Sequence, residues 1–169
     1  MGVDQIMSLA QDLERKKEFE RKVIEAASAE CQRLVEAMRM ALPEEFERLR
    51  PRLDETIKRC PKLPVPFKRR MFSAARHYEC TANTRAADRS LNLALSRARS
   101  DDVLERNRLL GEARRYANMA TRLGADAAFR TTLNRKIEII LLTGGVEHKG
   151  PTIAKPLDTA PKIPNIAKQ

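Results

Sequence analysis

The side chains most able to do chemistry are those of His77 and Cys80, which lie three positions apart. On a helix this spacing puts both on one face, where an imidazole and a thiolate could bind a metal ion or form a nucleophilic pair. The surrounding sequence supports neither role, because it holds no second histidine and no Cys-x-x-Cys pair. We therefore expect a helix-packed histidine and a buried cysteine, with no metal site and no catalytic centre.

Other sequence signatures of catalysis are missing as well. Gly144 and Gly145 follow a helical segment, without the lysine and the second helix that complete a phosphate-binding loop. Most carboxylates of the N-terminal region stand beside Lys or Arg, which is typical of surface ion pairs. We expect a protein that is not an enzyme and needs no cofactor.

Cysteine usage and hydropathy suggest a compartment. Cys31, Cys60 and Cys80 are odd in number and match no zinc-binding or redox spacing, which indicates reduced thiols. The longest apolar run, residues 137–142, contains Glu138 and is too short to span a membrane. We expect a soluble cytoplasmic protein with no signal peptide and no membrane contact.

The net charge of +10 is distributed unevenly along the chain. Residues 1–47 contain seven Lys and Arg against eleven Asp and Glu, whereas residues 48–136 contain twenty-two against nine. Eighteen of those twenty-two cations are arginines, whose planar guanidinium group can bind phosphate through two hydrogen bonds. The pattern favours a polyanionic partner, although a charged surface that only keeps a helical protein soluble would look similar.

The elements that must position these arginines are helices, since no segment alternates polar and apolar residues long enough to form a sheet. A long helix is expected from Phe67 to about Ala98. The face expected to be buried comprises Phe67, Met71, Ala75, Tyr78, Ala82, Ala86 and Leu93. Polar residues recur at intervals of seven on the opposite face, which should contact water or a partner: Arg69, Arg76, Asn83, Ser90 and Arg97.

Two more helices are expected on the C-terminal side. Ser100, Asp101 and Asp102 provide capping groups for a helix that ends at Gly124. Its expected buried face comprises Val103, Leu110, Ala113, Ala117 and Ala120. The last helix closes at Thr143-Gly144-Gly145, with an apolar face of Phe129, Leu133, Ile137, Ile140 and Leu141.

The N-terminal region is also expected to be helical. Residues 4–42 carry heptad-spaced small or apolar residues, interrupted by Lys17 and Glu20, at Ala10, Leu13, Ile24, Ala27, Cys31, Leu34, Met38 and Ala41. This face needs a partner helix, either in this chain or in another copy. Pro43 should open the next helix, with a kink or restart at Pro51, and the prolines of residues 60–66 should form an extended elbow.

Binding is the function that these features favour. Lys68, Arg69 and Arg70 place cations where the backbone N–H groups of a helix start already favour an anion. Most of the few aromatic residues fall on apolar faces, so contact with the nucleic-acid backbone is expected, with weak sequence preference and strong salt dependence. The candidate nucleic-acid-binding residues are Lys68, Arg69, Arg70, Arg76, Arg97, Arg108, Arg114, Arg115, Arg122, Arg130 and Arg135.

Residues 44–146 resemble the accessory variability determinant family, the small four-helix-bundle proteins that accompany the reverse transcriptase of diversity-generating retroelements. The resemblance is carried by four short motifs, Lys58-Arg59-Cys60-Pro61-Lys62, Leu109-Leu110-Gly111-Glu112-Ala113, Arg122-Leu123 and Leu141-Leu142-Thr143-Gly144-Gly145. It implies a basic bundle that forms a ring of identical subunits, binds the reverse transcriptase and its template RNA or cDNA, and supports mutagenic copying without catalysing it. The positions that match the family's basic surface are Arg69, Arg70, Arg76, Arg114, Arg115, Arg122, Arg130 and Arg135.

These observations predict an all-α protein with three regions: an acidic amphipathic helix over residues 1–42, a basic up-and-down four-helix bundle over residues 43–146, and a flexible Pro-rich and Lys-rich tail over residues 147–169. Its expected function is that of a nucleic-acid-binding accessory to a reverse transcriptase, acting as a homo-oligomer on RNA, DNA or both. The alternative is a protein-only helical scaffold that oligomerises through the heptads of residues 10–41.

Overall fold

A computed structural model describes residues 2–97 and 102–143. It contains α1 (Val3–Met38), the 3-10 turn η1 (Pro43–Glu45), α2 (Phe46–Arg59), α3 (Val65–Arg97), α4 (Val103–Leu123) and α5 (Ala127–Thr143). No strand occurs among these residues. The all-α class predicted from the sequence is therefore confirmed.

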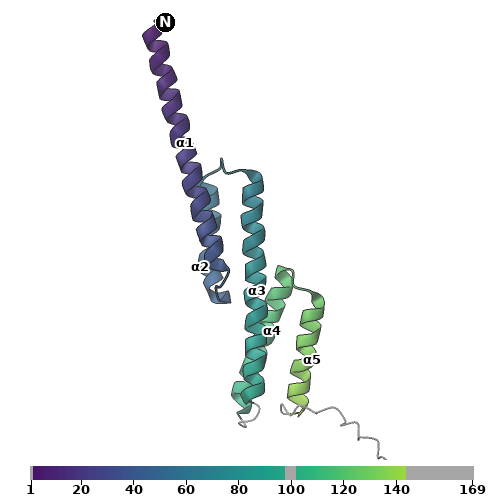
Figure 1. Ribbon diagram of the computed structural model, residues 1–169. Helices are drawn as coiled ribbons and strands as arrows, with labels where there is room; N and C mark the ends of the chain where they lie inside the picture. Colours follow the sequence, from purple (N-terminus) through teal and green to yellow (C-terminus); the bar gives the residue numbers. More distant parts are fainter. Residues whose placement is uncertain (1, 98–101, 144–169) are drawn as a thin grey trace, which may run out of the picture.

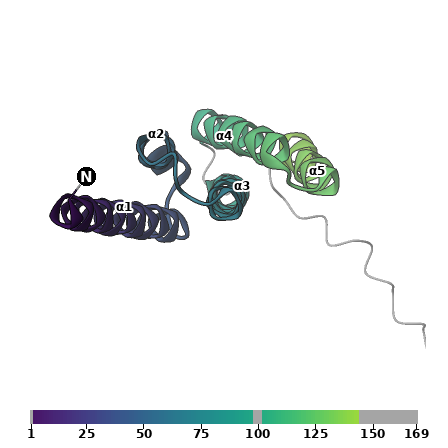
Figure 2. The same ribbon diagram turned by 90° about the horizontal axis from the view of Figure 1, so that it is seen from above.

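The long helix α3 is shared by two hydrophobic cores (Figures 1 and 2). The second half of α1 and all of α2 pack on the N-terminal half of α3. The helices α4 and α5 pack on its C-terminal half. The buried residues thus form two separate clusters, and the single core expected of a four-helix bundle over residues 43–146 is not seen.

Helix α3 changes its buried side between the two cores. Phe67, Ala75 and Ala82 belong to the first core, whereas Ala87 and Ala94 belong to the second. Ala87 follows Ala82 by five residues, which is about 140° around the helix axis. The two halves of α3 therefore present nearly opposite faces to their partners.

This change of side explains where the expectation of one continuous buried face was wrong. Asn83 and Ser90, expected to face water, are only 4% and 6% exposed, while Leu93, expected in the core, is 47% exposed. All three lie at or beyond the point where the buried side changes. Buried Asn83 satisfies its side-chain N–H by donating a hydrogen bond of 2.9 Å to the carbonyl of Glu79 within the same helix.

Small residues let α4 lie close against α3. Ala113, Ala117 and Ala120 are fully buried along α4, as the sequence predicted, and Cys80 Sγ lies 3.5 Å from the carbonyl oxygen of Ala120. Helices approach closely where such small side chains face each other. Val103, also expected on this face, is instead 50% exposed.

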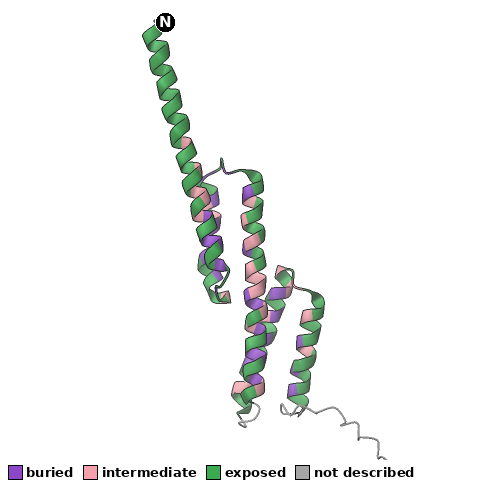
Figure 3. Ribbon diagram, in the orientation of Figure 1, coloured by how far each residue is buried: buried purple, intermediate pink, exposed green. Residues whose placement is uncertain are grey.

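The two halves of α1 differ in burial (Figure 3). From Cys31 to Met38 the helix contributes buried residues to the first core, with Ile24 and Ala27 partly buried against it. From residue 3 to residue 19 every residue is exposed, and this half projects beyond the rest of the protein (Figure 1). The heptad face thus has a partner within the chain over its second half only.

Several helix ends follow the capping rules read from the sequence. Asp102 caps α4 by accepting a hydrogen bond from the Glu105 N–H at 3.1 Å, and Gly124 ends α4 in the left-handed conformation with φ of 112°. Helix α2 runs through Pro51 without a break, so of the kink or restart expected there the restart does not occur. The elbow is shorter than predicted, because Pro66 already lies in the first turn of α3.

The C-terminal region follows the predicted pattern in part. Leu133, Ile137 and Ile140 of α5 are buried and Phe129 is half-buried, whereas Leu141 is exposed. Ser100, Asp101, the Gly144-Gly145 pair and the proposed tail lie outside the described residues.

Candidate nucleic-acid interface

Positive charge is concentrated on the three C-terminal helices. Together α3, α4 and α5 carry fifteen Lys and Arg against five Asp and Glu. Helices α1 and α2 together carry eleven of each. A polyanion would therefore be attracted to the α3, α4 and α5 side of the molecule rather than to the molecule as a whole.

The two groups of helices also differ in how their cations are used. On α1 and α2, Arg33 pairs with Glu30 at 2.7 Å, and Arg59 pairs with Glu55 at 2.5 Å. Such exposed pairs contribute little to stability, but they lower the charge available to an outside ligand. They make the surface of these two helices locally neutral.

One predicted binding residue, Arg108, is neutralised in the same way. Its guanidinium group bridges Glu105 at 2.6 Å and Glu112 at 2.5 Å, and these carboxylates raise its pKa further above the ordinary value. The pKa of Glu105 is lowered, chiefly by its hydrogen bonds with Arg108, with a smaller contribution from Arg97. Arg108 would have to leave two carboxylates before it could bind a phosphate.

A second predicted binding residue, Arg76, has a structural role. Its Nε donates a hydrogen bond of 2.9 Å to the carbonyl of Leu123, and its Nη2 donates one of 3.4 Å to the carbonyl of Arg122. These are carbonyls at the C-terminus of α4, which carries the negative end of the helix dipole. Arg76 thereby fixes the end of α4 against α3 and brings the start of α5 to the same place.

The other exposed candidates keep their charge available. They form no ion pair with any residue of 2–97 or 102–143, and they comprise Arg69, Arg70, Arg114, Arg115, Arg122, Arg130 and Arg135. Lys68 is half-buried and also without an ion pair in this part of the chain. Arg115 lies over the ring of Tyr116, with its Cζ 5.1 Å from the ring centroid, and its charge contributes to lowering the pKa of Glu44.

The predicted residues are spread along three helices and do not form one compact site. Arg69 and Arg97 lie near opposite ends of α3, about 42 Å apart at the helical rise per residue. Arg115 and Arg122 lie on the exposed side of α4, opposite its buried alanines. The hydrogen bonds of Arg76 place Arg122 beside α3, whereas Arg97 is far from Lys68, Arg69 and Arg70.

Sequence reasoning missed three exposed cations that share these helices. Arg85 and Arg89 on α3 and Lys136 on α5 are exposed and form no ion pair with a described residue. The spacing of Arg85 and Arg89 by four residues, which places both on one side of a helix, was the available signal.

A mixed-charge groove of 660 Å³ lies where the start of α2 meets the end of α4. Arg50 and Arg115 line it, but so do Glu44, Glu47 and Glu79. Three carboxylates would repel a phosphate group, so we do not assign this groove to the interface.

The residues that suggested metal or thiol chemistry are not assembled into a site. His77 is exposed, and Cys80 directs its thiol to the backbone of α4. Among the described residues there is no group of three or more His, Cys, Asp or Glu that could hold a metal ion. None of the described helices is both long enough and apolar enough to cross a membrane.

Comparison with known proteins adds no relative: the chain matches no protein-family model, and neither a curated protein nor a solved structure is significantly similar to it.

Proposed function

We propose that this protein binds nucleic acid, without catalysing a reaction, through the arginine-rich surface of α3, α4 and α5. The observation that supports the proposal is the separation of charge, with equal numbers of basic and acidic residues on α1 and α2 and a threefold excess of basic residues on the other three helices, of which Arg69, Arg70, Arg114, Arg115, Arg122, Arg130 and Arg135 form no ion pair with a described residue. A surface that served solubility alone would not need to confine its excess charge to three of the five α-helices.

The binding mode follows from the shape and the side chains of this surface. Arginines spread along three helices could contact several phosphates of a nucleic-acid backbone. Most aromatic residues of α3, α4 and α5 offer little for stacking, because Phe67 is buried and Tyr78, Tyr116 and Phe129 are half-buried; Phe72, which is 37% exposed, is the exception. RNA and DNA should therefore bind with similar affinity and little sequence preference.

The specific form of this proposal is an accessory role beside a reverse transcriptase. It rests on the resemblance of residues 44–146 to the accessory variability determinant family. In that role α2 to α5 would correspond to the four helices of the family's bundle, and the arginines of α3 to α5 would hold the template RNA or the cDNA. The reverse transcriptase would be the protein partner.

Fluorescence anisotropy with labelled single-stranded RNA and with duplex DNA tests the proposal. Titrations at about 50 and 200 mM salt should show an affinity that falls steeply with salt, since each neutralised phosphate releases counterions. Arg114→Gln/Arg122→Gln/Arg130→Gln should weaken binding to both ligands and reduce the salt slope by about two to three. The matched control is Arg15→Gln/Arg33→Gln/Arg39→Gln, which removes the same charge from α1 and its neighbouring residue.

The comparison of the two triple variants separates a local surface from net charge. If both variants lose affinity equally, net charge alone drives binding and the proposed surface is wrong. If the unmodified protein has no affinity at low salt, nucleic-acid binding itself is rejected.

A further inference from the structure

The exposed half of α1 continues the face that the second half buries. Ile6 and Leu13 occupy the heptad position that Ala27 and Leu34 occupy further along the same helix. Leu34 is 1% exposed in the first core, whereas Ile6 and Leu13 are 54% and 55% exposed. An apolar face of this kind needs a partner, and the first half of α1 has none within residues 2–97 and 102–143.

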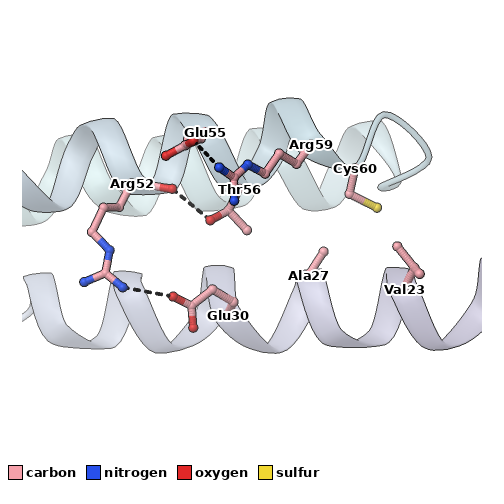
Figure 4. Close-up of a pocket in the computed structure, with 8 residues that line it drawn as sticks. All are labelled: Val23, Ala27, Glu30, Arg52, Glu55, Thr56, Arg59 and Cys60. Carbon is pink, nitrogen blue, oxygen red and sulfur yellow. Dashed lines mark hydrogen bonds and ion pairs between the residues drawn. The ribbon is translucent and has the colours of Figure 1, made fainter.

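A groove of 340 Å³ between the second half of α1 and α2 is a candidate for such a partner (Figure 4). Its apolar lining comes from Val23 and Ala27 on α1 and from Cys60 at the end of α2. Ion pairs edge the groove, with Arg52 and Glu30 3.5 Å apart. This combination of a small apolar floor and a balanced polar rim suits the apolar face of another amphipathic helix.

We propose that two copies of this chain form an antiparallel dimer in which the first half of each α1 lies in the groove between α1 and α2 of the other copy. The proposal concerns α1 and α2 only and does not depend on nucleic-acid binding. In this dimer the exposed apolar face of one copy fills the groove of the other copy.

The position of both features on one helix favours the antiparallel arrangement. The projecting face lies at the N-terminal end of α1 and the groove lies toward its C-terminal end. Antiparallel pairing of two such helices brings each projecting face onto the other copy's groove at the same time. The contact is then self-complementary and closes as a dimer with two-fold symmetry.

The heptad register provides a second argument. Lys17 and Glu20 are the two charged residues that interrupt the apolar face. When the two-fold axis passes midway between them, Lys17 of one copy faces Glu20 of the other. The same register places Ala10 opposite Ala27, which lines the groove, while Ile24 and Cys31 of the same face stay packed in the first core of their own chain.

The charge of the projecting half supports a second copy over a strongly charged partner. Residues 3–23 contain five acidic and five basic residues, so this segment has no excess charge to attract a polyanion or a basic protein. Glu20 already accepts an ion pair of 2.7 Å from Lys62, at the edge of the elbow before α3. A facing Lys17 would add a second cation to that carboxylate.

Light scattering coupled to size-exclusion chromatography tests the dimer on the full chain. The unmodified protein should have a molar mass of twice the 19.2 kDa chain at micromolar concentration. Ile6→Asp/Leu13→Asp should return it to a monomer with an unchanged circular-dichroism spectrum, because both residues project beyond the two cores. The matched control, Phe19→Asp, changes a residue that is 69% exposed but lies about 120° around the helix from Leu13, and it should remain a dimer.

Crosslinking tests the orientation. An oxidised mixture of Ala10→Cys and Ala27→Cys proteins should contain a mixed disulfide-linked dimer, whereas Ala10→Cys alone should link no more than the unmodified protein. A monomeric unmodified protein, or a dimer that survives Ile6→Asp/Leu13→Asp, overturns the proposal. Efficient linking of Ala10→Cys to itself also overturns it, because that result requires parallel helices.

Discussion

Tyr116 of α4 donates a hydrogen bond of 2.5 Å to the carboxylate of Glu44, which lies 72 residues earlier in the turn before α2. Glu44 belongs to the segment that leads into the first core, and Tyr116 packs against the second. The bond therefore joins the two halves of the molecule at a place other than α3. It also lowers the pKa of Glu44 and raises the pKa of Tyr116, since it favours the ionised carboxylate and the neutral phenol.

Tyr116→Phe should lower the free energy of unfolding by about 1–2 kcal/mol at neutral pH, because it removes a hydrogen bond to a charged group at a partly exposed site. The lowered pKa of Glu44 means that its contribution is present above the ordinary value of 4.5 and is lost as the pH falls through the lower folded-state value. The difference between variant and parent should thus shrink in acid. Urea denaturation between about pH 3 and pH 7 measures it.

The double variant Tyr116→Phe/Glu44→Gln provides the control. If the hydrogen bond links the two residues, the double variant should lose less stability than the two single variants added together. Additive losses would show that the two side chains act independently.

The close contact of α4 with α3 depends on small side chains and gives a second prediction. Ala113 is fully buried on α4, so Ala113→Leu should overfill the interface and destabilise the protein by about 1–3 kcal/mol. Asn118 is exposed on the same helix, and Asn118→Leu should change stability by less than about 0.5 kcal/mol. Thermal unfolding of both variants makes the comparison, and equal losses would contradict the role given to Ala113.

The bounds of most helices could be predicted, because they depend on local signals such as the cap at Asp102 and the glycine at position 124. The buried face of α3 could not be predicted in the same way. Alanines occur around much of this helix, so apolar spacing alone allows more than one buried face. Which face of α3 is buried depends on where its contact with α2 stops and its contact with α4 starts. Tertiary packing sets that position.

The sequence nevertheless contains a signal for the buried face of the second half of α3. Asn83, Ala87, Ser90 and Ala94 repeat at intervals of four, three and four, which is the spacing of a small-residue contact between helices. We interpreted Asn83 and Ser90 as solvent-facing because they are polar, although their small volume was the property that mattered. The structural use of Arg76 could not be predicted either, since its carbonyl partners are more than forty residues away.

The cysteines give a third prediction. Burial raises the pKa of the Cys31 thiol, and nearby Glu30 and Cys60 raise it further. The folded protein therefore favours the neutral thiol, and the stability that this contributes is present below the ordinary pKa of 9.0 and is lost as the pH rises above it. At pH 8 a thiol reagent should modify Cys31 and buried Cys60 far more slowly than half-buried Cys80.

Mass spectrometry after timed labelling measures this order of reactivity, and labelling in denaturant supplies the reference rates. All three thiols should react at similar rates once the chain is unfolded. If Cys31 reacted as fast as Cys80 in the native protein, the first core would be more open than the structure indicates.

The last prediction concerns Gly124 and Gly111 of α4. Replacing each with alanine should change the stability of the protein in opposite directions. Gly124 ends α4 with φ of 112°, a conformation that residues with a side chain rarely adopt, so Gly124→Ala should destabilise the protein by about 1 kcal/mol. Gly111 lies within α4, where an added Cβ would have no atom within 4 Å. Gly111→Ala should therefore stabilise the protein by about 0.5–1 kcal/mol, because alanine is the better helix former. Chemical denaturation of both variants tests the pair, and a loss of stability at Gly111 would mean that this face of α4 has a contact that the described residues do not provide.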